Sequence, residues 1–161
     1  MGAKDTLNQP LADFLPYQLS IASNAVSSRI SEQYRARFGL KVPEWRIMAV
    51  LGDAGHLTQR DLTAATLMDK VAVNRACKVL EDRGLAVRKP NKDDGRSHHL
   101  ELTEEGRAMH GGIMPLARAM EAEIVSGFTD EELTQFCTFL ARVRKSAGEL
   151  DCDSLDDFAP E

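Results

Sequence analysis

Several side chains between residues 70 and 78 have the types and the spacing needed to read a nucleic-acid duplex. Val71, Asn74, Arg75 and Lys78 share one face of a helix that begins near Lys70. Arginine can form two hydrogen bonds with guanine, asparagine can pair with adenine, valine can contact the methyl group of thymine, and lysine neutralises phosphates. This pattern indicates a helix that reads bases in a major groove, although an ordinary solvated helix face carries similar charges.

The surrounding segment has the signals of two helices joined by a short turn. The first helix is expected to start at Thr58, whose hydroxyl can accept a hydrogen bond from a free N–H of the first turn. The side chain of Asp61, three residues on, can accept a hydrogen bond from the Thr58 N–H. A turn at residues 67 and 68 leads to the second helix, which Asp69 caps and Gly84 ends. The second helix has an apolar face for docking, formed by Val73, Ala76, Cys77 and Leu80. We therefore expect a helix-turn-helix with the second helix as its recognition helix.

Two segments with alternating apolar residues follow the recognition helix. Residues 85–89 and 98–102 alternate as strands do, and the stretch between them is rich in Pro, Asn, Asp and Gly. A two-stranded hairpin with a basic tip is a wing. Arg96 could enter a minor groove while Asp94 holds its guanidinium, and Lys92 adds positive charge. A surface turn that serves only the backbone is the alternative.

The order and spacing of these residues resemble the MarR family of bacterial winged helix-turn-helix regulators. The resemblance covers about residues 15–150 and is carried by residues 69–75, 80–88, 94–96 and 102–106, with residues 43–46 similar to the start of the family's second helix. It implies an obligate homodimer that binds a pseudo-palindromic DNA operator. Such a protein usually acts as a repressor, and a small effector, often aromatic or phenolic, releases it from the operator.

The resemblance also assigns DNA contacts. The family's base-reading helix corresponds to residues 69–83, and its wing-tip Asp-x-Arg motif corresponds to Asp94 and Arg96. Val71 and Ala72 stand where the family commonly has small hydroxylated residues, so one or two hydrogen bonds to phosphate or base are expected to be missing. The expected DNA-binding residues are Thr58, Gln59, Lys70, Val71, Asn74, Arg75, Lys78, Lys92, Asp94 and Arg96.

The expected fold is mainly α with a β wing, a winged helix-turn-helix whose N- and C-terminal helices form a homodimerisation region. A length of 161 residues suits one domain. Apolar residues recur at helical spacing in both flanks, so we expect these helices to pack against a second copy, with packing inside one chain as the alternative. The expected parts are dimerisation helices at 11–38 and 107–148, a DNA-binding part at 43–106 and an acidic flexible tail at 149–161.

The net charge of −5 is unevenly distributed. Residues 55–100 contain nine Lys and Arg against six Asp and Glu, so this part carries +3 and the rest carries −8. A local basic surface is what attraction to phosphates requires. No apolar run approaches the ~20 residues of a membrane helix and no secretory signal precedes the first helix, so we expect a cytoplasmic protein without membrane contact. Without a G-x-S-x-G, G-x-G-x-x-G or H-E-x-x-H motif, we expect neither catalysis nor a cofactor.

An effector pocket is expected where the DNA-binding part meets the dimerisation helices. An effector bound there could change the distance between the DNA-binding parts of the two copies. Trp45, Met48 and Met109 could line a pocket for an aromatic effector. Arg46 or His110 could bind the carboxylate or phenolate of that effector. Each residue also has an ordinary interpretation in the core or on the surface. The candidate lining is Ser27, Trp45, Arg46, Met48, Met109 and His110.

Two glycines and a proline at residues 111–115 lie inside the helix that joins the wing to the C-terminal region. Each glycine costs about 1 kcal/mol relative to alanine, and proline removes an amide donor. We therefore expect weak helical continuity there, which would serve as a hinge or form a static bend.

The cysteines Cys77, Cys137 and Cys152 are far apart and lack metal-binding spacing, so no structural metal is expected. Cys77 suits packing on the inner face of the recognition helix. Its oxidation would disturb that helix, so a cysteine-based redox-sensing regulator is one alternative function. A non-specific architectural DNA-binding protein with the same fold is another, and the outward Asn74 and Arg75 favour specific reading over it.

Overall fold

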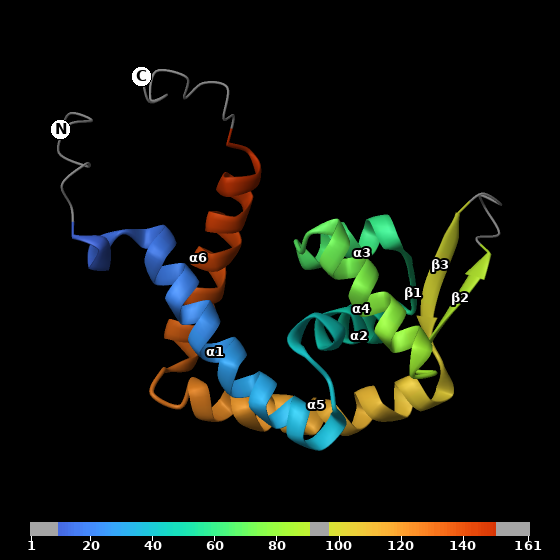
Figure 1. Cartoon of the computed structure of the whole chain (residues 1–161). Coiled ribbons are helices and arrows are strands. Elements are labelled where there is room, and N and C mark those ends of the chain that lie inside the picture. The colour runs from blue at the N-terminus through green and yellow to red at the C-terminus, as the bar shows by residue number, and fades with distance from the viewer. Residues whose placement is uncertain (1–9, 91–96, 151–161) are drawn as a thin grey trace. The chain divides into compact units, whose positions relative to one another are not determined.

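The computed structural model describes residues 10–90 and 97–150, which form a mainly helical fold with one small sheet, as expected (Figure 1). The chain divides into two compact units, residues 1–120 and 121–161. The elements are η2 Leu11–Asp13, α1 Leu15–Phe38, α2 Val42–Ala54, β1 His56–Thr58, α3 Gln59–Thr66, α4 Lys70–Asp82, β2 Ala86–Pro90, β3 His98–Leu102, α5 Glu104–Ile124 and α6 Asp130–Gly148. The wing-tip residues Lys92, Asp94 and Arg96 and the tail after residue 150 lie outside the described residues.

Capping side chains set the starts of α3 and α4, as the sequence predicts. The Thr58 hydroxyl accepts a hydrogen bond from the Asp61 N–H at 3.2 Å, and the Asp61 carboxylate accepts one from the Thr58 N–H at 3.1 Å. One carboxylate oxygen of Asp69 accepts from the N–H groups of Val71 and Ala72, at 2.9 and 2.8 Å. These bonds satisfy amides that a helix start leaves without partners. The helix-turn-helix therefore has the expected boundaries.

Strands β2 and β3 form the predicted hairpin, and a third strand, β1, extends the sheet. The strands are antiparallel in the order β1-β3-β2, and β1 pairs His56 with Glu101 and Thr58 with His99. β1 was not predicted from the sequence, because its three residues are too few for an alternating pattern to be visible. It forms where the chain between α2 and α3 runs along the second edge of β3. This pairing ties the wing to the start of α3.

We call α2 to β3, residues 42–102, the head. Its core is apolar, and α4 contributes the four residues that were predicted to dock. Leu62 of α3 and Leu100 of β3 are fully buried with them. The buried side chains that the head contributes to the core are Ile47, Met48, Leu51, Leu62, Val73, Ala76, Cys77, Leu80, Leu85, Ala86, Leu100 and Leu102.

α5 is a continuous helix through residues 111–115, so the expected weakness there was wrong. Ile113 is fully buried, Leu116 packs against the core, and a Cβ added at Gly112 would lie 3.8 Å from the Phe38 ring. Pro115 removes one amide donor from the interior of the helix. Packing of this side of α5 outweighs the local penalties, since tertiary contacts contribute more to most protein helices than intrinsic propensity does.

The flanking helices leave many apolar side chains exposed. α6 buries none of its residues, and Phe136, Phe139 and Leu140 are between 40% and 53% exposed. α1 buries only Tyr34, while Leu15 and Ile21 nearer its start are exposed. In residues 10–90 and 97–150 there is no helix of the length and apolarity that a membrane crossing requires.

Candidate nucleic-acid interface

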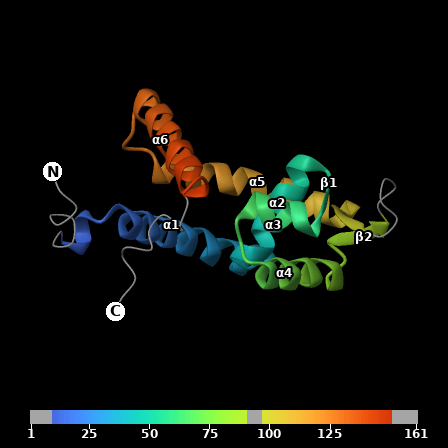
Figure 2. The same ribbon diagram turned by 90° about the horizontal axis from the view of Figure 1, so that it is seen from above.

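The outward face of α4 is presented on the outside of the head (Figure 2). Val71 is 60% exposed although it is apolar, and Asn74, Arg75 and Lys78 are also exposed. Within the described part of the chain, the side chains of Asn74 and Arg75 form no hydrogen bond or ion pair. Lys78 is paired with Asp82 at 3.3 Å, an exposed pair of the kind that contributes little to stability. The side chains needed for base reading are thus available at the surface.

The opposite face of α4 fixes the helix in the head. Val73, Cys77 and Leu80 are fully buried, and Ala76 is nearly so. Because this face cannot turn without losing its apolar contacts, the orientation of the outward face is set by the core. The four docking residues and the outward residues lie as the sequence predicts.

The turn that leads into α4 has an unusual backbone. Leu67 adopts a left-handed conformation with φ of 51°, and its side chain is 74% exposed. The turn ends at Asp69, whose carboxylate caps α4, so Lys70 begins the helix as an exposed cation. Lys70 is therefore placed beside the outward face, where a phosphate contact was predicted.

Thr58 and Gln59 line an open hollow of about 490 Å³ between the start of α3 and the wing. Arg60 and Arg88 also line it, together with His98. The Thr58 hydroxyl is engaged by Asp61, to which it donates at 2.6 Å, so its first role is to cap α3. The Asp61 carboxylate also lines the hollow and Arg88 is paired with Glu81, so Arg60 is the cation that could contact a phosphate there.

Ion pairs hold the base of the wing against α4 and within the sheet. Arg88 donates two hydrogen bonds to the Glu81 carboxylate, at 3.1 and 3.0 Å, and this carboxylate raises the pKa of Arg88 above its ordinary value. Lys89 pairs with Glu101 across β2 and β3, and its hydrogen bond lowers the pKa of Glu101. The sheet therefore has a fixed connection to the recognition helix.

Cys77 is fully buried on the inner face of α4. Desolvation raises the pKa of its thiol to about 11, so the thiol is protonated at neutral pH. Oxidants react with thiolates far faster than with thiols, and access is blocked as well. The environment matches a packing role for this cysteine.

The candidate effector residues are distributed between core and surface. Trp45 and His110 are brought together, with ring centroids 6.1 Å apart and planes inclined by 21°. Met48 is fully buried in the core, whereas Arg46 is exposed on α2. Ser27 on α1 and Met109 on α5 are half-buried. In the described residues, no three His, Cys, Asp or Glu side chains are grouped as a metal ion would need.

Two further residues in this region were not found from the sequence. The buried Tyr34 ring of α1 lies 4.9 Å from Trp45, and a Cβ at Gly52 would lie only 2.5 Å from the His110 ring. The aromatic side chains of Tyr34, Trp45 and His110 therefore form one row across α1, α2 and α5. Tyr34 lies four residues from both Ile30 and Phe38, a spacing that identifies it as part of a buried stripe.

Comparison with known proteins agrees with this geometry. A model of the MarR family matches residues 38–97. An HTH-type transcriptional repressor of Mycobacterium tuberculosis is 27% identical over 105 residues, which are 65% of this chain and 76% of the repressor. A MarR/EmrR family regulator of Acinetobacter sp. ADP1 has a similar structure, with a TM-score of 0.83, 24% identity and coverage of 88% of this chain and 100% of that one. A mutant MarR of E. coli complexed with operator DNA gives a TM-score of 0.72 at 20% identity, covering 84% and 99%.

Proposed function

We propose that this chain is a member of the MarR family, whose model matches residues 38–97 and whose members are transcriptional regulators and not enzymes, and that it acts as a homodimeric cytoplasmic repressor of a pseudo-palindromic operator. The outward face of α4 carries the proposal. Val71, Asn74 and Arg75 are exposed there, while the other face of the same helix is locked into the core. A structural neighbour with the same fold is complexed with operator DNA, which supports DNA as the partner.

Specific reading follows from the chemistry of this face. Arg75 donates two hydrogen bonds to a guanine, Asn74 pairs with an adenine, and Val71 packs on a thymine methyl group. Lys70 and Lys78 contact phosphates, as do Thr58 and Gln59 at the start of α3. In the wing, Lys92 and Arg96 reach a flanking minor groove, with Asp94 orienting the Arg96 guanidinium.

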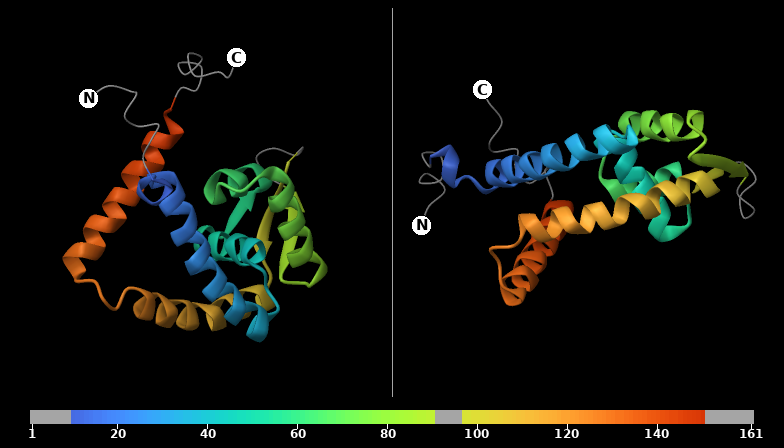
Figure 3. Two further views of the ribbon diagram at one scale, coloured as in Figure 1. Left: turned by 60° about the vertical axis from the view of Figure 1, so that its left-hand side comes forward. Right: turned by 90° about the horizontal axis from the view of Figure 1, so that it is seen from below.

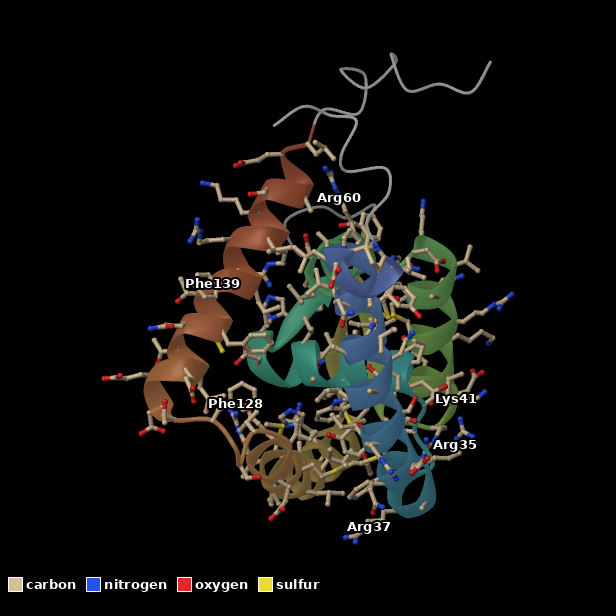
Figure 4. The ribbon with its side chains drawn as sticks, turned by 90° about the vertical axis from the view of Figure 1, so that its left-hand side faces the viewer. Arg35, Arg37, Lys41, Arg60, Phe128 and Phe139 are labelled. Carbon is tan, nitrogen blue, oxygen red and sulfur yellow. The ribbon has the colours of Figure 1, made fainter. Side chains whose placement is uncertain are left out.

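A second copy of the chain is the proposed partner of the flanking helices, residues 11–38 and 107–148. An unassisted monomer would leave the apolar face of α6 in water, because that helix buries none of its side chains. Phe128 in the turn before α6 and Phe139 on α6 are both about half-exposed (Figure 4). Twofold symmetry would place the two α4 helices in successive major grooves, about 34–36 Å apart.

A small aromatic or phenolic effector is proposed to release the operator. The row formed by Tyr34, Trp45 and His110 crosses α1, α2 and α5, so a planar guest that stacks on it would change how the head meets its supporting helices. Arg46 on the same helix as Trp45 supplies a cation for a carboxylate or phenolate. The remaining proposed contacts are with Ser27, Met48 and Met109.

The test is selection of bound duplexes from a random pool at one near-physiological salt concentration. Enrichment of an inverted repeat with half-sites one helical turn apart is the expected result. A pool that stays random despite binding would identify a non-specific architectural protein, whose affinity depends on phosphate contacts alone. Transcription from a promoter that carries the enriched site, with and without the protein, then distinguishes repression from activation.

A further inference from the structure

Arg83 joins the end of α4 to the end of α1. Its Nη1 donates to the Gly39 carbonyl and its Nη2 donates to the Phe38 carbonyl, both at 2.9 Å. The partners lie more than forty residues apart in the sequence. Two bonds from one planar guanidinium fix direction as well as distance, which a lysine ammonium cannot do.

The two acceptors are carbonyls at the C-terminal end of α1. A helix leaves its last carbonyls without internal partners, and these carry the negative end of the helix dipole, so a guanidinium is a favourable partner there. Gly39 ends α1 with a φ of 64°, and its own N–H still bonds to the Arg35 carbonyl at 3.1 Å. The next residue, Leu40, is fully buried and anchors the chain beside these bonds.

The remaining attachment of α1 to the core is small and lies in its C-terminal part (Figure 3). Tyr34 is its only buried residue, and Ile30 and Phe38 pack partly against the core. Apolar packing of this kind is non-directional. The two hydrogen bonds of Arg83 therefore supply the directional part of the link between α1 and the recognition helix.

We propose that Arg83 is a positioning residue that fixes the angle between α1 and α4, and thereby limits the spacing of half-sites that the dimer accepts. The proposal rests on the proposed function, because it needs α1 in a dimer and α4 on DNA. Arg75 lies eight residues before Arg83, about 12 Å along the helix axis. A rotation of about 10° at Arg83 would displace Arg75 by about 2 Å, which is enough to lose a pair of hydrogen bonds to guanine.

The first measurement uses the full chain and the inverted repeat obtained from the random pool. Duplexes in which the half-sites are moved apart or together by one base pair are compared with the optimal duplex. We expect the unmodified protein to discriminate by about tenfold, the worth of one bidentate base contact. For Arg83→Ala this ratio should fall to about twofold. Without the two hydrogen bonds to α1, the head can shift to reach the displaced half-site.

Two further variants separate positioning from charge and from folding. Arg83→Lys keeps the positive charge but cannot donate two parallel hydrogen bonds, so we expect a ratio of affinities between those of the unmodified protein and Arg83→Ala. It also serves as the test variant if Arg83→Ala does not fold. Arg37→Ala removes the same charge from the last turn of α1, where the side chain points away from the body (Figure 4). This control should keep full discrimination. A uniform loss of affinity with unchanged discrimination in Arg83→Ala would identify a phosphate contact and overturn the proposal.

A second measurement does not depend on DNA. Trp45 is the single tryptophan and packs on Tyr34 of α1, so its quenching by acrylamide reports whether that end of α1 stays docked. We expect quenching to increase in Arg83→Ala and to be unchanged in Arg37→Ala. If the pool shows no inverted repeat while quenching increases, the proposed function fails and the Arg83 link stands. Unchanged quenching in Arg83→Ala overturns the link itself.

Discussion

Gly106 lies at a junction where a single methyl group should disturb the recognition helix. A Cβ at this position would lie 1.9 Å from the Leu85 carbonyl oxygen and 2.9 Å from its carbon. These are backbone atoms, so no side-chain rotation relieves the contact. Leu85 is two residues beyond the Arg83 cap of α4, and its carbonyl accepts the Thr103 N–H at 3.1 Å. Gly106→Ala therefore requires the end of α4 and the start of α5 to separate.

The magnitude follows from the distances. The Leu85 oxygen must move by about 1 Å to reach even a tight contact, which breaks its bond with Thr103 at a cost of about 1 kcal/mol. Overpacking of a filled site adds about 1–3 kcal/mol. We expect Gly106→Ala to lower the free energy of unfolding by about 2–4 kcal/mol and the melting temperature by about 8 °C.

Gly111 is the matched control on the same helix. A Cβ there meets no atom within 4 Å, so Gly111→Ala should gain the helix propensity of alanine, about 1 kcal/mol. Both variants are measured by urea and thermal unfolding at one protein concentration, because dimerisation makes stability concentration-dependent. The reasoning is refuted if Gly106→Ala is as stable as the unmodified protein, or if both variants lose stability equally.

Three other substitutions test the interface, the buried thiol and the dimer. Arg75→Ala should weaken operator binding by about 1–3 kcal/mol and relax base preference at one position in each half-site, measured by repeating the selection; unchanged binding would show that another face of α4 reads DNA. Because burial raises the pKa of the Cys77 thiol to about 11, the unfolded state loses this proton first, and stability should fall by about 1–3 kcal/mol between pH 9 and 11. Cys77→Ala should lack that part of the slope in urea unfolding, and an identical slope would contradict the assignment. Phe139→Ala should weaken self-association by at least about tenfold in sedimentation equilibrium, whereas an unaltered dimer would place the interface elsewhere.

Local signals in the sequence predicted most of the helix-turn-helix. Thr58 with Asp61, and Asp69 with the amides that follow it, act over two or three residues, so their consequences depend little on the rest of the chain. The apolar face of α4 has the same character, because helical periodicity alone places Val73 and Leu80 together. The outward placement of Arg75 follows directly from that periodicity.

Contacts between distant segments were not predictable in the same way. β1 exists because β3 offers an edge to three extended residues, and α5 remains continuous because Ile113 is buried against elements far away in sequence. The row of Tyr34, Trp45 and His110 likewise joins three helices. In each case the stabilising partner comes from a segment whose position is set by the packed core, not by local preference.

The sequence by itself determined the class of fold, the boundaries of the reading helix and the chemistry of its outward face, because capping and amphipathic periodicity are short-range effects. Only the tertiary structure decided what holds that helix in place. Arg83 reads in the sequence as one more cation before a helix-ending glycine, and its bonds to the Phe38 and Gly39 carbonyls appear only when two helix ends meet in space. A guanidinium finds such partners through packing at long range, and no spacing along the chain encodes them.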